Sequence, residues 1–566
     1  VDIVTEAGPS QRPETTEDVE NVATGVTIGE VVEVAGGGGN LADALAAAEE
    51  NGLVVAKGGD GDLDGGVELE DGQTLIGGGH NLAVRGVDSG QTMTYTAPGS
   101  RGTVIINGGE APVVELANNT YVGGLSIQGD SSMGRDSALV GAPENTENLH
   151  IIRNDISRTG GYGAGFMKNS SDITLHENRI SNTENGNIAF GEDVSNVELT
   201  RNHVSGTQGS GVGFLDGASD IRLSGNKIMD AGEHGIHFEG RSENITLTGN
   251  RVSETGRNGV YFEGSASNVT LASNDISRTG VPFDGNVDGS GLAFVDGAND
   301  IKVKRNTISE TSGDGIFFTD GESISDIQLS GNSLADIDGD GIDMNADDIS
   351  NVTISDNILS DIGSTGIFSY GQVTKLTVEG NLISGQEGSN SGISIYEGGS
   401  EMRLTGNSIS DFDSSGMFLT GDEYEDLMVD DNSISGTGSD GIFFTSSLKD
   451  TTVKNNSIFN AEGSGISLVT GADGLVLEGN LISAIDESGI YLTGIDHDAQ
   501  IDSNRFEGKI GTDLFWLGSG HYIGTDNVDA TEELGGDVCA DIAGTYTGPG
   551  FTIETSGGTE TCGDSY

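Results

Sequence analysis

The stretch Ile245-Thr-Leu-Thr-Gly-Asn-Arg-Val252 decides the fold, because close copies of it return along most of the chain. Two of these copies are Met402-Arg-Leu-Thr-Gly-Asn-Ser-Ile409 and Leu475-Val-Leu-Glu-Gly-Asn-Leu-Ile482. The asparagine returns every 24 to 26 residues, with one longer step after Asn274. Such a fixed period is typical of a solenoid, in which each repeat is one coil that buries its apolar side against its neighbours. The repeated residues are Asn154, Asn178, Asn202, Asn226, Asn250, Asn274, Asn306, Asn332, Asn357, Asn381, Asn407, Asn432, Asn456, Asn480 and Asn504.

Apolar and polar residues alternate within each repeat, as they do in half-buried strands. Ile245 and Leu247 show this pattern in the first half of a repeat, and Val260 and Phe262 show it in the second half. Nothing between them has helical spacing, so each coil is predicted to hold two or three short strands joined by polar bends. About 24 residues per coil matches a right-handed parallel β-helix, an all-β solenoid whose strands pair in parallel between coils.

The repeated asparagine is predicted to point into the coil. Asn250 and Val252 lie two positions apart in a strand, so both should face the same side. An inward amide can donate to one neighbouring coil and accept from the other, which predicts a continuous ladder. Left-handed turns alone would explain the residue type, but not its fixed place before an inward Ile or Val. The predicted inward apolar residues include Val252, Ile276, Ile308, Ile409, Ile434, Ile458 and Ile482.

The composition agrees with a solenoid and restricts the partners. The 566 residues include 93 Gly and 7 Pro, which suits tight bends and strands whose N–H groups all pair. The formal charge of −65 argues against nucleic acid or anionic membranes as partners and suits a high-salt habitat, a cation-rich surface, or both. No apolar run reaches membrane-spanning length, so direct membrane insertion is not expected. We expect an extracellular or cell-surface protein in its mature form, because the chain begins with Val1 rather than Met.

The two ends of the chain differ from the regular repeats. Asn40 is predicted to cap a helix that runs to Glu50 and covers the open N-terminal end of the solenoid. Cys539 and Cys562 are predicted to form a disulfide in a small C-terminal cap, and two free thiols are the alternative. The predicted regions are a tail or linker (1–30), the cap helix with irregular first coils (31–149), regular coils (150–505) and a C-terminal cap (506–566).

Three segments carry a family resemblance. They are Leu69-Glu-Asp-Gly-Gln-Thr-Leu-Ile-Gly-Gly-Gly79, Thr96-Ala-Pro-Gly-Ser-Arg-Gly-Thr-Val104 and Val114-Glu-Leu-Ala-Asn-Asn-Thr-Tyr-Val122. Together they resemble the opening of β-helix passengers on bacterial surface proteins, particularly passengers of inverse-autotransporter type. The coils themselves resemble the broad right-handed parallel β-helix repeat family. The resemblance implies a β-helix and an exported bacterial protein, and it implies little about activity.

One group of chemically active residues lies just before the longest repeat. His237 and Tyr261 are 24 residues apart, so they should stack on one face of neighbouring coils. With Glu239 and Glu263 they could remove and return a sugar C5 proton, while Arg257 could hold a uronate carboxylate. This predicts a lyase or epimerase acting on an acidic polysaccharide. The alternative is a set of ordinary outward positions beside a long loop.

An aromatic stripe is predicted at the outward position between the two apolar residues of each Gly-Ile-x-Phe segment. It could stack on sugar rings, which predicts a carbohydrate-binding surface, or bury itself against another subunit. Stabilisation of the sheet without any ligand is the alternative. The stripe comprises His237, Tyr261, Phe317, Phe368, Phe418, Phe443 and Tyr491, with small or polar residues in other coils.

Two runs of aspartates have the spacing of a calcium loop. The second run is Asp336, Asp338, Asp340 and Asp347, and chance occurrence within the repeat is a serious alternative for it. No cofactor other than calcium is expected. The first run is Asp60, Asp62, Asp64 and Asp71.

The main functional prediction is a non-catalytic extracellular structural or adhesive protein that assembles with copies of itself. Val1, Ile3 and Val4 are predicted to form a strand that adds to an exposed edge of the next subunit. Head-to-tail contacts of this kind produce open filaments if they do not close into rings. The alternative is that the tail folds back onto its own coils.

Overall fold

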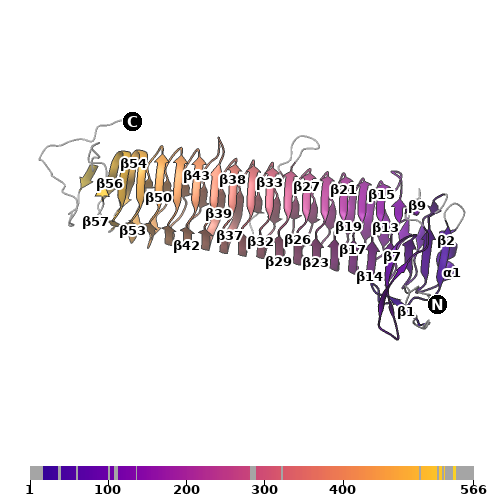
Figure 1. Cartoon of the computed structure of the whole chain (residues 1–566). Helices are drawn as coiled ribbons and strands as arrows, with labels where there is room; N and C mark the ends of the chain where they lie inside the picture. The colour runs from indigo at the N-terminus through magenta and orange to yellow at the C-terminus, as the bar shows by residue number, and fades with distance from the viewer. Residues whose placement is uncertain are drawn as a thin grey trace, which may run out of the picture. The chain divides into compact units, whose positions relative to one another are not determined.

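The computed structural model is an all-β parallel solenoid with one helix among the residues that it describes (Figure 1). The chain divides into two compact units, residues 1–289 and 290–566, and each consists of stacked coils. In the described part, no helix is long and apolar enough to cross a membrane. The structure describes residues 17–542 except 36–39, 59–60, 100–101, 107–111, 136, 281–288, 320–322, 496–498, 519–521, 526–527 and 530–538.

Most regular coils hold three short strands that pair in parallel with the strands of the next coil. In the regular coils of unit 1 the pairing joins residues 24 positions apart, for example Ile173 with Val197. One predicted repeat is therefore one coil. Two successive coils are β17 (Ser171–His176), β18 (Arg179–Thr183) and β19 (Gly186–Phe190), followed by β20 (Ser195–Thr200), β21 (His203–Thr207) and β22 (Val212–Phe214).

The bends explain why Gly, Asn and Asp are so frequent. The residue before each ladder asparagine has a positive φ, as at Arg201 (55°) and Gly225 (63°). Glycine adopts this backbone without strain, and Asn and Asp tolerate it better than other residues do. At another bend Asn268 Nδ2 donates to Asn244 Oδ1 of the preceding coil at 2.7 Å. Both asparagines belong to Asn-x-Thr triplets. The structural repeat explains these triplets, because the asparagines bond to each other at equivalent positions of successive coils.

The predicted asparagine ladder is confirmed in both units. In unit 1, Asn202 Nδ2 donates to Asn226 Oδ1 at 3.0 Å and to the Leu175 carbonyl at 2.8 Å. The same Asn226 Oδ1 accepts the backbone N–H of Asn202 at 2.9 Å. In unit 2, Asn432 repeats this pattern with Asn456. None of the ladder asparagines is more than 4% exposed, so the side chains satisfy one another inside the coil.

Inward apolar residues stack on their equivalents in the next coil. The rings of Phe190 and Phe214 lie 4.5 Å apart and nearly parallel, and Phe238 continues the stack 4.7 Å beyond Phe214. The predicted inward residues Val252 and Ile276 are buried in unit 1. In unit 2 the predicted residues Ile308, Ile409, Ile434, Ile458 and Ile482 are fully buried as well.

A helix closes the N-terminal end of unit 1, as predicted (Figure 1). Asn40 caps α1 (Leu41–Ala48), because its Oδ1 accepts the N–H of Asp43 at 3.2 Å. The helix buries Leu41 and packs against the first strands of the solenoid. Those strands are β2 (Val31–Ala35) and β3 (Leu53–Lys57).

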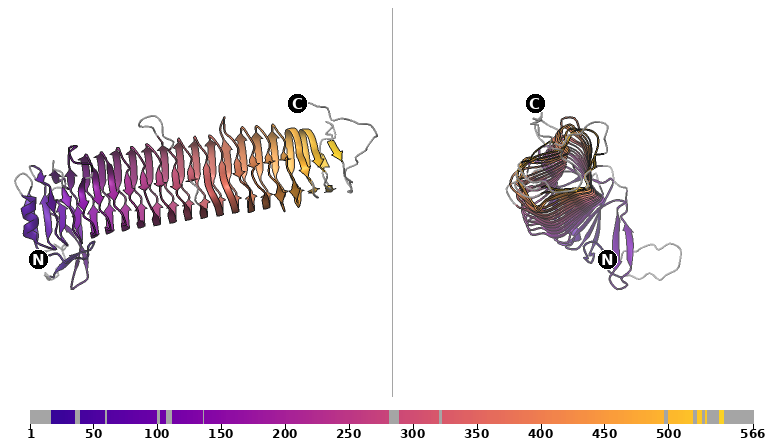
Figure 2. Two further views of the ribbon diagram at one scale, coloured as in Figure 1. Left: turned by 180° about the vertical axis from the view of Figure 1, so that it is seen from behind. Right: turned by 90° about the vertical axis from the view of Figure 1, so that its left-hand side faces the viewer.

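A small antiparallel sheet also belongs to this end of unit 1, and its hairpin leaves the stack of coils (Figure 2). Val19 and Ile28 share a buried core with Leu82 and Val84. The second half of the predicted tail, residues 17–30, therefore packs against the first coils instead of forming a linker. The sheet consists of β1 (Val19–Asn21), β7 (Asn81–Gly86) and β8 (Thr92–Thr96).

Parallel pairing in unit 2 continues beyond residue 505, where the regular coils were predicted to end. β56 (Arg505–Gly518) pairs with β54 (Leu481–Ile495), and β59 (Cys539–Ile542) pairs with β56. Part of the predicted C-terminal cap therefore continues the solenoid. Cys562 lies outside the described residues, as do Val1, Ile3 and Val4. The disulfide and the donor strand stay predictions.

Candidate functional site

A groove of about 550 Å³ lies on unit 1, and its floor consists of small residues. Gly141, Gly165, Ala189 and Gly213 follow one another in register on four neighbouring strands. The next position in this register is His237. All five residues line the groove. The floor is thus the outward position at which other coils carry an aromatic ring. The strands are β13 (Ala138–Ala142), β16 (Tyr162–Phe166), β19, β22 and β25 (Ile236–Phe238).

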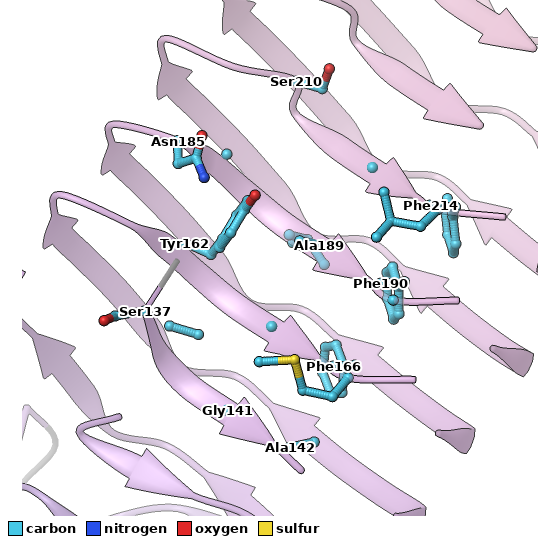
Figure 3. Close-up of a pocket in the computed structure, with 18 of the residues that line it drawn as sticks. Ser137, Gly141, Ala142, Tyr162, Phe166, Asn185, Ala189, Phe190, Ser210 and Phe214 are labelled. Carbon is cyan, nitrogen blue, oxygen red and sulfur yellow. The ribbon is translucent and has the colours of Figure 1, made fainter. Parts of the chain in front are cut away.

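The two margins of the groove differ in chemistry. Figure 3 shows Ser137, Tyr162, Asn185 and Ser210 along one margin, where the strands begin. The opposite margin follows the buried phenylalanines at the ends of these strands. It includes the apolar side chains of Met167 and Leu215, which are 53% and 44% exposed. The groove therefore has a polar margin and an apolar margin.

Two of the residues that the sequence predicted as catalytic, His237 and Glu239, line one end of the groove, and two others, Tyr261 and Glu263, lie next to His237. His237 Nε2 lies 2.9 Å from Glu263 Oε2 of the next coil, and the His237 ring lies 5.2 Å from the Tyr261 ring. His237 and Tyr261 face each other in register on β25 and β28 (Val260–Phe262), as their spacing predicted. Glu239 and Glu233 line the same end of the groove. The structure thus brings a histidine, a tyrosine and carboxylates together.

His234 of the same coil also belongs to this group. Its ring lies 4.5 Å from that of Tyr261 and 4.9 Å from that of His237, and it is only 5% exposed. Burial, and then the charges of His237 and Arg257, lower the pKa of His234 to about 3. Its Nδ1 is buried without a hydrogen-bond partner.

Arg257 does not line the groove, and its role in holding a sugar carboxylate stays a prediction. Its side chain is exposed, and it acts on the site through the positive charge that reaches His234. The ionisable residues that line the groove in the described structure are Glu115, Tyr162, Glu233, His237 and Glu239.

The predicted aromatic stripe is interrupted in unit 2. Asp343 occupies the stripe position between Phe317 and Phe368, and Ser394 occupies it between Phe368 and Phe418. Ser467 likewise separates the last two aromatic residues, Phe443 and Tyr491. The stripe residues are half-buried by the neighbouring coils. Small or polar residues take the stripe position in other coils, as the sequence indicated, and Phe418 and Phe443 form a local pair 5.5 Å apart.

A carboxylate cluster in unit 2 replaces the calcium loop predicted at 336–347. Asp314, Asp340 and Asp343 each place a carboxylate oxygen within 4.8 Å of the others. Of the predicted ligands, Asp340 belongs to this cluster, whereas Asp336 and Asp338 are exposed and lie outside it. Burial, followed by the charges of Asp314 and Asp340, raises the pKa of Asp343 to about 8. The cluster forms across two coils, whereas the prediction followed the chain.

The other predicted calcium loop does not gather its carboxylates. Asp62, Asp64 and Asp71 are exposed and form no cluster of three, and Asp60 lies outside the described residues. Asp71 Oδ1 accepts the backbone N–H of Asn118 at 3.1 Å, which gives this side chain a role in the bend.

Comparison with known families agrees with the fold. The model of the right-handed β-helix region matches residues 102–276, 210–383 and 350–506, which together cover most of the chain. The chain therefore belongs to the right-handed parallel β-helix family. No curated protein sequence matches it.

Solved structures that resemble the chain have diverse functions. The mannuronan C-5 epimerase AlgE6 A-module of Azotobacter vinelandii is 14% identical over 86% of this chain and 93% of its own, with a TM-score of 0.29. The N-terminal fragment of bacteriophage phi29 gene product 12 is 13% identical over 91% and 95%, with a TM-score of 0.37. PfbA, a surface adhesin of Streptococcus pneumoniae, is 12% identical over 87% and 89%, with a TM-score of 0.23. Likenesses of this degree carry no argument about function.

Proposed function

We propose that this protein binds carbohydrate, and that the groove of unit 1 holds an uncharged glycan chain. The observation that carries the proposal is the floor of four small residues between a polar and an apolar margin. Sugar rings present apolar faces and hydroxyl edges, so Met167 and Leu215 can contact a face while Tyr162 and Asn185 bond to hydroxyls. The small floor residues let a chain approach the backbone across several coils.

The charge of the groove favours an uncharged ligand over the acidic polysaccharide that the sequence suggested. Glu115, Glu233 and Glu239 line it, and none of its described lining residues is Lys or Arg. The formal charge of the whole chain is −65. A polymer of uronic acids would meet repulsion from the protein and from these three carboxylates.

The substitution Gly213→Phe tests the proposal directly. A Cβ on Gly213 meets no atom within 4 Å, so the new ring can enter the groove without displacing neighbours. Thr246→Phe is the matched control, because Thr246 faces outward on β26 (Ser242–Thr248) and does not line the groove. Calorimetry should show an uncharged oligosaccharide that binds the native protein and the control but binds Gly213→Phe at least tenfold more weakly. Equal binding by all three proteins, or binding of uronans alone, would overturn the proposal.

An adhesive role at an extracellular surface is part of the same proposal. Its support is the acidic composition together with the resemblance to passengers of bacterial surface proteins. Self-assembly through Val1, Ile3 and Val4 is a further element that rests on the sequence alone. Deletion of residues 1–12 should leave a folded monomer, as measured by light scattering. Fibres formed by the truncated protein would contradict tail-mediated assembly.

A second candidate function is proton transfer on a bound uronan. The pairing of His237 with Glu263, beside the Tyr261 ring, favours it, because a carboxylate bound to one imidazole nitrogen orients the ring for general acid or base work. Alginate and pectate should then gain unsaturated ends, or exchange C5 protons in deuterated water, and His237→Gln or Tyr261→Phe should abolish this. Absence of turnover across a uronan panel would exclude the enzyme and leave the binding proposal in place.

A further inference from the structure

The carboxylate cluster of unit 2 has the dimensions of a cation site. One oxygen from each of Asp314, Asp340 and Asp343 lies within 4.8 Å of the other two. Calcium holds its oxygen ligands at about 2.3–2.6 Å, so ligands on opposite sides of one ion are at most about 5 Å apart. Without a cation, three carboxylates at this separation repel one another.

Asp343 supplies a second and independent observation. Its side chain is only 9% exposed, and its Oδ1 is buried without a hydrogen-bond partner. It occupies the stripe position in register with Phe317 on one side and Phe368 on the other. A carboxylate buried beside two aromatic positions and left without a donor destabilises a fold unless a positive charge compensates it.

Asp440 is a buried aspartate of unit 2 that lies outside the cluster, and it serves as a comparison for Asp343. It occupies the same bend position as Asp340 and, like Asp343, is 9% exposed. Its Oδ1 accepts the backbone N–H of Ser464 at 2.6 Å, so the next coil satisfies it. Asp340 Oδ1 has the equivalent bond from Thr365 N–H at 2.6 Å, which holds that carboxylate in place. Of Asp340, Asp343 and Asp440, Asp343 alone lacks such a donor on Oδ1 in the described structure.

We propose that Asp314, Asp340 and Asp343 bind one hard divalent cation, with calcium preferred over magnesium. Carboxylate oxygens without any His or Cys select hard cations over zinc or copper. Asp314 and Asp340 are partly exposed, so water can complete the six to eight ligands that calcium accepts. Magnesium requires a nearly ideal octahedron at shorter distances, which three side chains from two coils do not readily adopt. The bound ion would join these two coils.

Calorimetric titration of the full chain with calcium chloride tests this site. The 90 acidic residues bind calcium weakly all over the surface, so the titration is done in high salt and compared between variants. The native protein and Asp440→Asn should each bind one calcium ion well above this background. Asp343→Asn should lose that ion, and its affinity should fall at least tenfold. Calcium should raise the melting temperature of the native protein and of Asp440→Asn by several degrees more than that of Asp343→Asn.

The variant itself should fold, because asparagine replaces a buried carboxyl group with a neutral group of the same shape. Its melting temperature without divalent ions should equal or exceed that of the native protein. Identical titrations for the native protein and Asp343→Asn would overturn the site. Loss of calcium in Asp440→Asn as well would show that the response is not specific to the cluster. A stronger response to magnesium chloride would overturn the preference for calcium.

Discussion

The side-chain amide of Asn407 joins three coils, because its Nδ2 donates to Asn432 Oδ1 at 3.0 Å on one side and to the Val378 carbonyl at 2.9 Å on the other. Its own Oδ1 accepts the backbone N–H and the Nδ2 of Asn381, both at 3.0 Å. Asn407 is 1% exposed, so water cannot replace these bonds when the amide is removed.

Asn407→Ala should therefore lower the free energy of unfolding by about 1–3 kcal/mol, because it leaves buried donors and acceptors without partners. Urea denaturation followed by circular dichroism measures the change, and hydrogen exchange at Asn381 should accelerate. Asn390→Ala is the control, since Asn390 is exposed and donates to Ser364 Oγ at the surface. We expect this control to stay within about 0.5 kcal/mol of the native protein. Equal losses in the two variants would contradict a special role for the ladder.

The ladder could be predicted because its determinants are local and repeated. Strand alternation places Asn250 and Val252 on the same side, and a period of 24 residues superimposes the asparagines of successive coils. Helix α1 was equally accessible, since Asn40 and the apolar spacing that follows it lie within one short segment. In both cases the physical cause is contained in neighbouring residues.

The groove could not be found in the same way, because it is formed where side chains are missing. Gly213 and Ala189 have no reactive or polar side chain, so the sequence gives no sign that they form a site. The cluster of Asp314, Asp340 and Asp343 was predicted only in part, because the second aspartate run included Asp340 but neither of its partners. In the sequence, Asp314 lies 26 residues before Asp340, and Asp343 lies three residues after it. Only the register between coils of unequal length brings them together, whereas the calcium-loop pattern groups aspartates along the chain.

Gln73 should be essential for the N-terminal end of unit 1. It is fully buried, and its Nε2 donates to the carbonyls of Leu45 and Glu49 at 3.0 and 2.9 Å, at the C-terminal end of α1. Gln73→Leu keeps the size of the side chain but removes both bonds, so the free energy of unfolding should fall by about 1–3 kcal/mol. Hydrogen exchange in residues 41–48 should rise. Gln91→Leu, at an exposed position, should leave both measurements unchanged, and a silent Gln73→Leu would contradict the assignment.

Phe214 should contribute to stability through the stack of inward rings. It is 1% exposed and lies between Phe190 and Phe238, with centroid distances of 4.5 and 4.7 Å. Phe214→Ala creates a cavity in the stack and should cost about 3–5 kcal/mol by urea denaturation. Phe214→Leu retains much of the buried apolar volume and should cost clearly less. Similar costs for the two variants would mean that the removed volume does not determine the effect.

His234 should make the stability of unit 1 depend on pH. Its folded pKa of about 3 lies below the unfolded value of about 6.5, because burial opposes the charged ring. The folded state therefore binds fewer protons, and the contribution of the neutral ring is fully present above about pH 6.5 and decreases as the pH falls toward 3.

The carboxylates also titrate in this range, so the comparison requires a variant that shares them. His234→Asn is suitable, because Asn258 occupies the same bend position in the next coil. Between pH 7 and pH 5 the native protein should lose about 2 kcal/mol of unfolding free energy relative to His234→Asn, at about 1.4 kcal/mol per pH unit below 6.5. Parallel urea denaturation series at the two pH values measure this difference. A difference that stays constant would show that His234 takes up a proton equally readily in the folded and unfolded states, which its burial against Tyr261 and His237 opposes.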